Sequence, residues 1–344
     1  PHADLLTARG IHFSYFLSRG GGRNAELKGV RAMVGKGLRI VEYVRLLPSA
    51  IAAARRMRPD VVHANDGPSG LVWGVAAKAA GAPFVWHVRN SEGEGSRWAD
   101  WLRMRLADRL ILVSPTVARR FANLAPPPYA VIFNGVDTNT FTPPTDKAAA
   151  KRAAGLPDAG LVAGFAGSLV ARKRPEWTIA ALQRARQQGV DLHLAIAGED
   201  FDAGATAQRL RKMASDAGVG HALHVLGDQS DLPAFMQALD VLLLPSRLEA
   251  FGRVIVEAMA AGVPTLATDA EGPRLIISDG HDGYLTPVEE AATFAARLAA
   301  LAAEPEKLAE TGRKARSTVR ARFDHVVTLD AVTDVYRTVC RAGA

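Results

Sequence analysis

One pattern repeats along the 344-residue chain: a short, continuous run of apolar residues is followed by a longer segment rich in Ala, Leu, Arg and Gln. Apolar runs that do not alternate with polar residues are typical of strands buried on both faces of a sheet. Segments such as 175–188 and 206–217 have the length of helices, so the order predicts an α/β fold with two open parallel sheets covered by helices. We expect the strands at 11–17, 61–64, 84–88, 110–113, 131–133, 162–166, 192–197, 224–226, 241–244 and 265–267.

The chain is about twice as long as a usual single domain, which predicts two domains. Threonines and prolines interrupt the periodicity once, and we expect a linker there, over 141–157. The predicted domains are therefore 1–140 and 158–322, followed by a helix over 323–344 that packs back toward the N-terminal domain. The chain opens inside a helical segment, so we expect the first strand of the N-terminal domain to be missing.

Charge is distributed unevenly between the two halves. The whole chain has 42 Lys and Arg against 35 Asp and Glu, and residues 1–140 alone have 19 against 10. Such an excess predicts that the N-terminal half faces something anionic. It comes without aromatic interleaving or a known nucleic-acid-binding module, so we expect no nucleic-acid partner.

Cysteine usage and the absence of targeting segments predict a cytoplasmic protein. The single cysteine, Cys340, cannot form an internal disulfide, which is typical of a reducing compartment. The apolar runs are too short to span a bilayer, and no secretory signal precedes them.

The densest sequence signal lies at 245–285. A buried strand is expected to lead into a turn and then into a helix that begins near Phe251 and ends at Gly262, a residue suited to the left-handed position after a helix. Glu249 then precedes the helix, and Glu257 lies about two turns inside it. The first N–H groups of a helix have no intrahelical acceptor, so those around Phe251, Gly252 and Arg253 are predicted to bind a phosphate.

A second signal lies at 163–177, between a predicted strand and a predicted helix. Gly167 and Ser168 follow the strand, and three basic residues, Arg172, Lys173 and Arg174, come shortly after. Of the three, Arg174 is the one we expect to be solvated.

Together these segments resemble glycosyltransferase family 4. The resemblance rests on two glutamates separated by seven residues, on Phe-Gly after the first, and on Glu-Ala-Met-Ala-x-Gly-x-Pro after the second. In style the motifs are similar to those of bacterial lipopolysaccharide and exopolysaccharide enzymes. The family implies a GT-B fold, in which two Rossmann-like parallel-sheet domains face each other across a cleft, and a retaining transfer from a nucleotide sugar without a metal cofactor.

The resemblance also implies roles for individual residues. Lys173 and Arg172 would contact the diphosphate, since Ser168 stands where many members have an arginine. Glu249 would contact the donor sugar and Glu257 the ribose hydroxyls. The remaining donor contacts would come from Gly167, Ser168, Gly198, Phe251, Gly252 and Arg253.

His87 is the candidate from the N-terminal half. It ends a predicted strand, and the resemblance implies that it contacts the donor sugar or the diphosphate. A structural histidine is the alternative. The pair Asp200 and Asp202 has the spacing of a metal-binding motif, but no third ligand accompanies it, and we expect no metal site.

The partners implied are a nucleotide sugar, with UDP favoured over GDP, and a glycan or lipid-linked acceptor in envelope or exopolysaccharide synthesis. Basic residues accompany a helical pattern of apolar residues over 30–59, which predicts peripheral association with an anionic membrane; a helix that packs on the core and keeps its arginines solvated is the alternative. The family's opening glycine-rich loop is expected to be absent, because Gly20–Gly22 fits a later strand. A non-catalytic nucleotide- or sugar-binding GT-B protein is therefore the alternative function.

Overall fold

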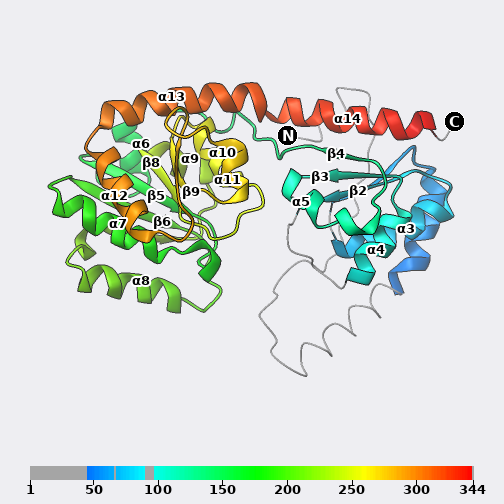
Figure 1. The fold of residues 1–344 in the computed structure, drawn as a ribbon, viewed down its shortest axis with the longest axis horizontal. Coiled ribbons are helices and arrows are strands. Elements are labelled where there is room, and N and C mark those ends of the chain that lie inside the picture. The colour runs from blue at the N-terminus through cyan, green and yellow to red at the C-terminus, as the bar shows by residue number, and fades with distance from the viewer. Residues whose placement is uncertain (1–44, 66, 90–96, 343–344) are drawn as a thin grey trace. The chain divides into compact units, whose positions relative to one another are not determined.

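The computed structural model describes residues 45–65, 67–89 and 97–342, and they form two compact units (Figure 1). The first unit comprises the described residues up to Ile132 together with those from Thr328 onward, and the second comprises Phe133–Val327. Each unit is described by itself. The predicted strand at 11–17, the glycines at 20–22 and the first half of the basic segment at 30–59 lie outside the described residues. No helix in the described ranges is both long and apolar enough to cross a membrane.

The first unit contains a parallel four-stranded sheet in the order β1-β2-β3-β4. Its strands are β1 (Val62–Ala64), β2 (Phe84–Val88), β3 (Arg109–Leu112) and β4 (Tyr129–Val131). Its helices are a segment over 45–57, α3 (Gly67–Ala79), α4 (Arg97–Leu106), α5 (Pro115–Arg119) and the short η1 (Ala122–Leu124), with α14 (His325–Ala342) returning to the unit at its residue Thr328.

The two central strands of this sheet are buried, as the continuous apolar runs predicted, whereas the edge strand β4 is exposed at Tyr129 and Val131. Strand β2 is buried along its whole length. On one face, Val85 and Ile111 pack with Val332, Val335 and Val339 of α14, whose spacing of three and four residues places them on one side of that helix. The last helix of the chain is therefore part of the core of the first unit.

The second unit contains a parallel six-stranded sheet in the order β10-β9-β8-β5-β6-β7. Its strands are β5 (Leu161–Ala166), β6 (Leu192–Ala197), β7 (Leu223–Gly227), β8 (Val241–Leu244), β9 (Thr265–Thr268) and β10 (Tyr284–Thr286). Its helices are α6 (Lys147–Ala153), η2 (Ala171–Lys173), α7 (Glu176–Gln187), α8 (Ala205–Asp216), η3 (Gly220–Ala222), α9 (Leu232–Ala238), α10 (Arg253–Ala260), α11 (Glu271–Ile276), α12 (Ala291–Ala302) and α13 (Pro305–Arg322).

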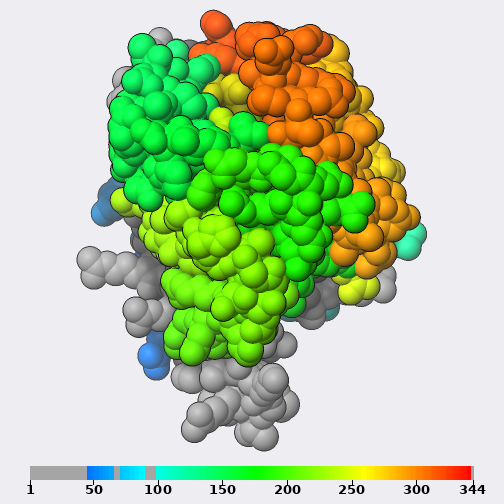
Figure 2. Space-filling model, turned by 90° about the vertical axis from the view of Figure 1, so that its left-hand side faces the viewer, coloured from blue at the N-terminus to red at the C-terminus, as the bar shows by residue number. Residues whose placement is uncertain are grey.

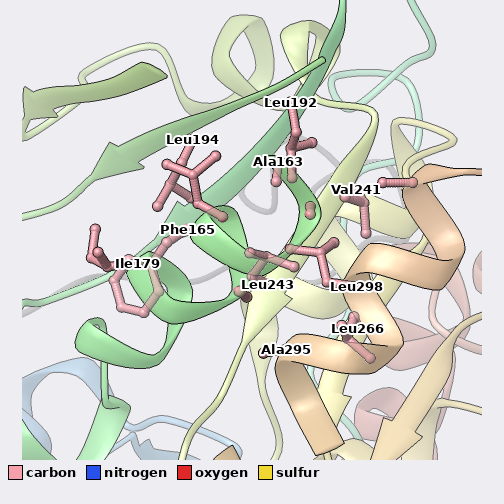
Figure 3. Packing of buried hydrophobic residues seen from close by; sticks show 14 of the residues in the cluster. Ala163, Phe165, Ile179, Leu192, Leu194, Val241, Leu243, Leu266, Ala295 and Leu298 are labelled. Carbon is pink, nitrogen blue, oxygen red and sulfur yellow. The ribbon is translucent and has the colours of Figure 1, made fainter. Parts of the chain in front are cut away.

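Both faces of this sheet are buried. Phe165 and Leu243 point to one face, where Ile179 of α7 and Leu298 of α12 cover them (Figure 3). Helices α7, α8 and α12 form the outer surface on that side, seen as green, yellow-green and orange in Figure 2. The neighbouring residues along the strands, such as Leu242, pack on the other face against α9 and α10. Burial of both faces explains why the strands read as continuous apolar runs.

Eight of the nine strands predicted within the described ranges form at or within one residue of the predicted bounds, and β4 lies two residues before the predicted 131–133. The tenth observed strand, β10, was not predicted. It has only three residues and pairs through its backbone with β9. The segment expected to be a linker, 141–157, contains α6, which packs against α9 in the second unit. Buried Lys151 of α6 forms an ion pair of 2.7 Å with Asp240, whose carboxylate also accepts the N–H of Val162. Contacts between residues distant in sequence therefore hold this polar, proline-bordered segment in the domain.

Gly262 has the left-handed conformation predicted for it, with φ of 75° directly after α10. The helix itself is shorter than expected and begins at Arg253. Helix α13 crosses the end of α10 so closely that a Cβ on Gly312 would lie 2.0 Å from the carbonyl oxygen of Gly262. The absence of a side chain at Gly312 therefore permits the close approach of these helices.

We predict that Gly312→Ala destabilises the second unit by roughly 1–3 kcal/mol, because the added methyl overpacks a backbone contact. Helix propensity alone would make this change stabilising, since alanine is a better helix former than glycine by about 1 kcal/mol. A loss of stability therefore reports the steric contact. Thermal and urea unfolding measure the change. Gly220→Ala is the control, because a Cβ there would meet its nearest atom at 3.4 Å; equal stability of the two variants would contradict the prediction.

Candidate functional site

The candidate residues of the second unit follow three neighbouring strands. Gly167 comes directly after β5, Gly198 after β6, and the loop over 245–252 after β8. Because β8, β5 and β6 are adjacent and parallel, their carboxyl ends lie at one edge of the sheet. The structure therefore brings these candidates together, although 82 residues separate Gly167 from Glu249 in the sequence.

Two glycines make the close approach of backbone segments possible at this edge. Gly198 has φ of 154°, and a Cβ there would lie 1.9 Å from the carbonyl oxygen of Gly167. Gly167 has φ of 139°, and its Cβ would lie 2.9 Å from Nζ of Lys173. Any side chain at either position would displace neighbouring atoms. Gly198 is thus required for strand packing, and Gly167 leaves the space in which Lys173 lies.

Lys173 and Glu249 face each other at the centre of the site. Nζ of Lys173 lies 3.6 Å from Oε2 of Glu249, and each side chain is about one-seventh exposed. Oε2 is buried and has no hydrogen-bond partner among the described residues, so the ammonium is the charge that faces it. The ammonium of such a pair can bind an anionic group of a ligand, and the carboxylate can accept hydrogen bonds from hydroxyl groups.

Glu257 lies in α10, eight positions after Glu249, and is only 7% exposed. Burial raises the pKa of its carboxyl above the ordinary value of 4.5, while the nearby charges of Arg253 and Lys173 lower it. Nη2 of Arg253 donates a hydrogen bond of 3.1 Å to Oε1 of Glu257. Gly252, at φ of 95°, caps the helix at its N-terminus. The predicted grouping of two acids around the first turn of this helix is thus present.

The remaining candidates differ in how they can contribute. Phe251 is buried and stacks on Phe133 at 5.6 Å between ring centroids, so its side chain is part of the core and only its backbone is available to a ligand. Arg172 is exposed, and its carbonyl accepts the N–H of Arg247 at 2.8 Å. Ser168 is half-buried in the turn after β5. The Arg172 side chain is therefore exposed at the end of the loop after β5.

The expectation that Arg174 is solvated was wrong. It is 9% exposed, donates to the carboxylate of Glu289 at 2.6 Å and to the carbonyl of Val288, and its guanidinium lies over the Trp177 ring. Val288 and Glu289 are more than a hundred residues away along the chain, so no local signal identified them; Trp177 lies only three residues away, in the predicted helix at 175–188.

The Asp200 carboxylate has a structural role. It accepts the N–H of Asp202 at 3.0 Å and that of Ala207, in the first turn of α8, at 2.8 Å. Acids in such positions cap helices. Within the part of the chain that is described, no cluster of three or more His, Cys, Asp or Glu side chains is arranged to hold a metal ion.

His87 belongs to the first unit, where it lies in β2 near the carboxyl end of the sheet. It is 4% exposed, and neither ring nitrogen has a hydrogen-bond partner among the described residues. Its ring lies 5.4 Å from that of His63, whose Nδ1 lies 2.5 Å from the hydroxyl of Tyr336 on α14. Sequence reasoning missed His63 and Tyr336, although a histidine at the end of the neighbouring strand was an available signal.

Both histidines are held neutral. Burial lowers the pKa of His63 from 6.5 to about 4, with a further lowering from the charge of Arg89. Burial likewise lowers the pKa of His87, and the neighbouring His63 and Arg89 add to the effect. A neutral imidazole can accept a hydrogen bond from a hydroxyl group and donate another.

We predict that the first unit loses stability as the pH falls from 6.5 to 4. The unfolded His63 binds a proton near pH 6.5 and the folded one only near pH 4, so protons favour unfolding throughout this window. The loss from His63 is on the order of 3 kcal/mol by linkage. Unfolding of wild type and His63→Asn at pH 7 and pH 5 measures it: the variant should show a flatter pH dependence, and an unchanged slope would refute the assignment.

Comparisons with known proteins agree with this arrangement. Residues 146–318 match the family of glycosyl transferases group 1, and residues 2–140 match glycosyltransferase family 4. A D-inositol 3-phosphate glycosyltransferase of Streptomyces bingchenggensis is 31% identical over 68% of this chain and 54% of its own length. One from Thermobispora bispora is 30% identical over 82% of this chain and 73% of its own. The chain thus spans between about half and three quarters of these relatives.

Solved structures show the same fold. Anabaena Alr3699/HepE in complex with UDP has a TM-score of 0.77 at 24% identity, covering 86% of this chain and 82% of that one. Sucrose-phosphate synthase from Thermosynechococcus elongatus has a TM-score of 0.73 at 22% identity, covering 87% and 79%. The predicted α/β, GT-B type of fold with two Rossmann-like parallel-sheet domains is confirmed. With both family matches covering the two halves and the glutamate motif folded around α10, the chain belongs to the group 1 glycosyl transferases, with an N-terminal part of family 4 type.

Proposed function

We propose that this protein is a retaining glycosyltransferase that moves a sugar from a nucleotide sugar to a glycan or lipid-linked acceptor in envelope or exopolysaccharide synthesis. The observation that carries the proposal is the Lys173–Glu249 pair, 3.6 Å apart beside Gly167 and just before the N-terminus of α10. This arrangement offers a cation for a diphosphate and a carboxylate for sugar hydroxyls. The matches to glycosyltransferase families support the reaction class.

The transfer breaks the bond between the anomeric carbon and the diphosphate oxygen, and the diphosphate leaves with the electron pair. Lys173 and Arg172 stabilise the negative charge that develops on it, and such preorganised donors are most effective in the transition state. The acceptor hydroxyl forms the new bond on the same face of the sugar, and its proton passes to a diphosphate oxygen. Glu249 binds the donor sugar and Glu257 the ribose hydroxyls.

UDP is the nucleotide that we propose for the donor. The structural neighbour HepE was solved with UDP and with UDP-glucose, which supports this choice over GDP. We propose that no metal ion is needed, because Lys173 and Arg172 supply positive charge to the diphosphate. The excess of basic residues in 1–140 supports an anionic acceptor, and the curated relatives are named for one, D-inositol 3-phosphate.

We predict that Lys173→Ala lowers kcat/KM by about 100- to 1,000-fold, or on the order of 3–4 kcal/mol, the usual effect of removing one transition-state donor. Lys307→Ala is the control, because Lys307 is exposed on α13 and pairs only with Glu304 among the described residues. Steady-state transfer from UDP-sugars, with and without EDTA, provides the measurement. An unimpaired Lys173→Ala enzyme removes the assignment of Lys173.

The alternative, a non-catalytic nucleotide- or sugar-binding GT-B protein, gives a different result in the same experiment. Calorimetry with UDP and GDP measures binding, and donor hydrolysis or transfer measures turnover. Binding of UDP without any turnover, also in a chain extended at its N-terminus, would replace the proposed enzyme with this alternative.

We also propose that the protein associates with the inner face of an anionic membrane through the basic segment 30–59. In its described part, the helix over 45–57 exposes Leu46 and Met57, each 40% exposed, among exposed arginines. Exposed apolar residues among arginines suit a surface of anionic lipid. Ala50 and Ala54 of the same helix are buried and pack on α3.

Sedimentation with anionic liposomes tests this surface. We expect binding at low ionic strength that falls at high salt, and we expect Arg45→Glu/Arg56→Glu to weaken it several-fold, since each basic residue near such a surface contributes about 1 kcal/mol. Equal binding to neutral liposomes, or none to anionic ones, would contradict it. Lys212→Glu, at an exposed residue of α8 in the second unit, is the control for a charge reversal outside this segment.

A further inference from the structure

Glu289 connects two of the loops that form the site. It lies between β10 and α12, and its carboxylate contacts Arg174 at 2.6 Å and Arg247 at 3.4 Å. Arg174 directly follows Lys173, and Arg247 lies two residues before Glu249. One carboxylate therefore contacts the loop after β5 and the loop after β8, which carry the two facing charges of the site.

The backbone of Arg174 has an unusual conformation. Its φ and ψ are both 50°, in the left-handed region that glycine enters freely and other residues enter at a cost of about 1–2 kcal/mol. Pro175 follows it and restricts its backbone further. This turn ends η2 directly after Lys173 and leads the chain into α7, so it fixes the course of the backbone next to Lys173. Contacts elsewhere in the structure have to compensate the cost of this conformation.

The side chain of Arg174 provides that restraint. It is 11% exposed, so its guanidinium depends on protein partners rather than on water. The carbonyl of Val288 and the carboxylate of Glu289 accept its hydrogen bonds, and the guanidinium carbon lies 4.5 Å from the centroid of the Trp177 ring. Glu289 is itself 66% exposed; without its carboxylate the guanidinium would keep, of these partners, only the Val288 carbonyl and the Trp177 ring, which is an unfavourable arrangement for a cation with little access to water.

We propose that Glu289 and Arg174 form a clamp that positions Lys173 opposite Glu249. Neither residue touches the ligand: both are positioning residues, and they act through Lys173. The clamp rests on the function proposed above for Lys173. Through the clamp, the loop between β10 and α12 contributes to the proposed diphosphate site, although it follows the segments 163–177 and 245–285 in the sequence.

Double-mutant cycles test whether the clamp acts through Lys173. We expect Glu289→Gln and Arg174→Gly each to lower kcat about 10- to 100-fold, because small misplacements of a positioned group have effects of this size. In a Lys173→Ala background the same changes should have almost no further effect on kcat. Arg174→Gly also separates the clamp from backbone strain, since glycine adopts this conformation without strain and would be neutral if strain alone mattered.

Glu290→Gln is the matched control. It makes the same chemical change one residue away, at a carboxylate that accepts a hydrogen bond from Thr293, and we expect kcat within two-fold of wild type. Effects of Glu289→Gln and Lys173→Ala that multiply fully would show that Glu289 acts independently of Lys173 and would overturn the proposal. The same holds if Glu289→Gln and Glu290→Gln behave alike.

Acylation of lysines, followed by mass spectrometry, gives a readout that does not depend on activity. Lys173 is 13% exposed in the clamped loop, and Lys212, at 75%, serves as the internal reference. Glu289→Gln should raise the labelling rate of Lys173 several-fold relative to Lys212. A wild-type protein that transfers no sugar would refute the proposed function, whereas an unchanged labelling rate would refute the clamp.

Discussion

The site of the second unit depends on the close approach of two backbone segments at the ends of β5 and β6. Where the chain passes Gly167, the neighbouring strand end comes so near that Gly198 has no room for a Cβ, which would lie 1.9 Å from a carbonyl oxygen. Because of this contact, the turn after β5 packs directly on the end of β6. The Lys173 side chain passes over Gly167 and reaches Glu249. Parallel strands place their carboxyl ends at one edge, but the glycines determine how closely the loops converge there.

The electrostatics of the site follow from this convergence. Lys173 faces Glu249 and also lowers the pKa of Glu257, which burial raises. One ammonium thus compensates two acids that are largely removed from water, and removing one partner of such a group leaves the others unfavourably charged. The arrangement suits a site built to receive a ligand with both negative charge and hydroxyl groups. The two neutral histidines of the first unit offer hydrogen bonds without charge.

Local sequence signals predicted a large part of this arrangement. The glutamates at 249 and 257 and the glycine at 262 belong to one strand-turn-helix unit, in which spacing along the chain fixes spacing in space. Contacts between distant segments were not accessible in the same way. Arg174 was expected in water because its partners, Val288 and Glu289, follow a three-residue strand that pairs through backbone atoms and carries no periodic signal. Tyr336, which pairs with His63, comes from the last helix of the chain.

The sequence by itself determined the two parallel sheets, the motif around α10 and the family to which the chain belongs, because continuous apolar runs and fixed local spacings encode strand burial and helix termini directly. Only the tertiary structure decided where α6 and α14 pack, which basic residue of the 172–174 run is buried, and which side chains surround His87. These features depend on contacts between residues tens to hundreds of positions apart, and on steric limits such as that between Gly312 and Gly262, for which a linear pattern has no counterpart.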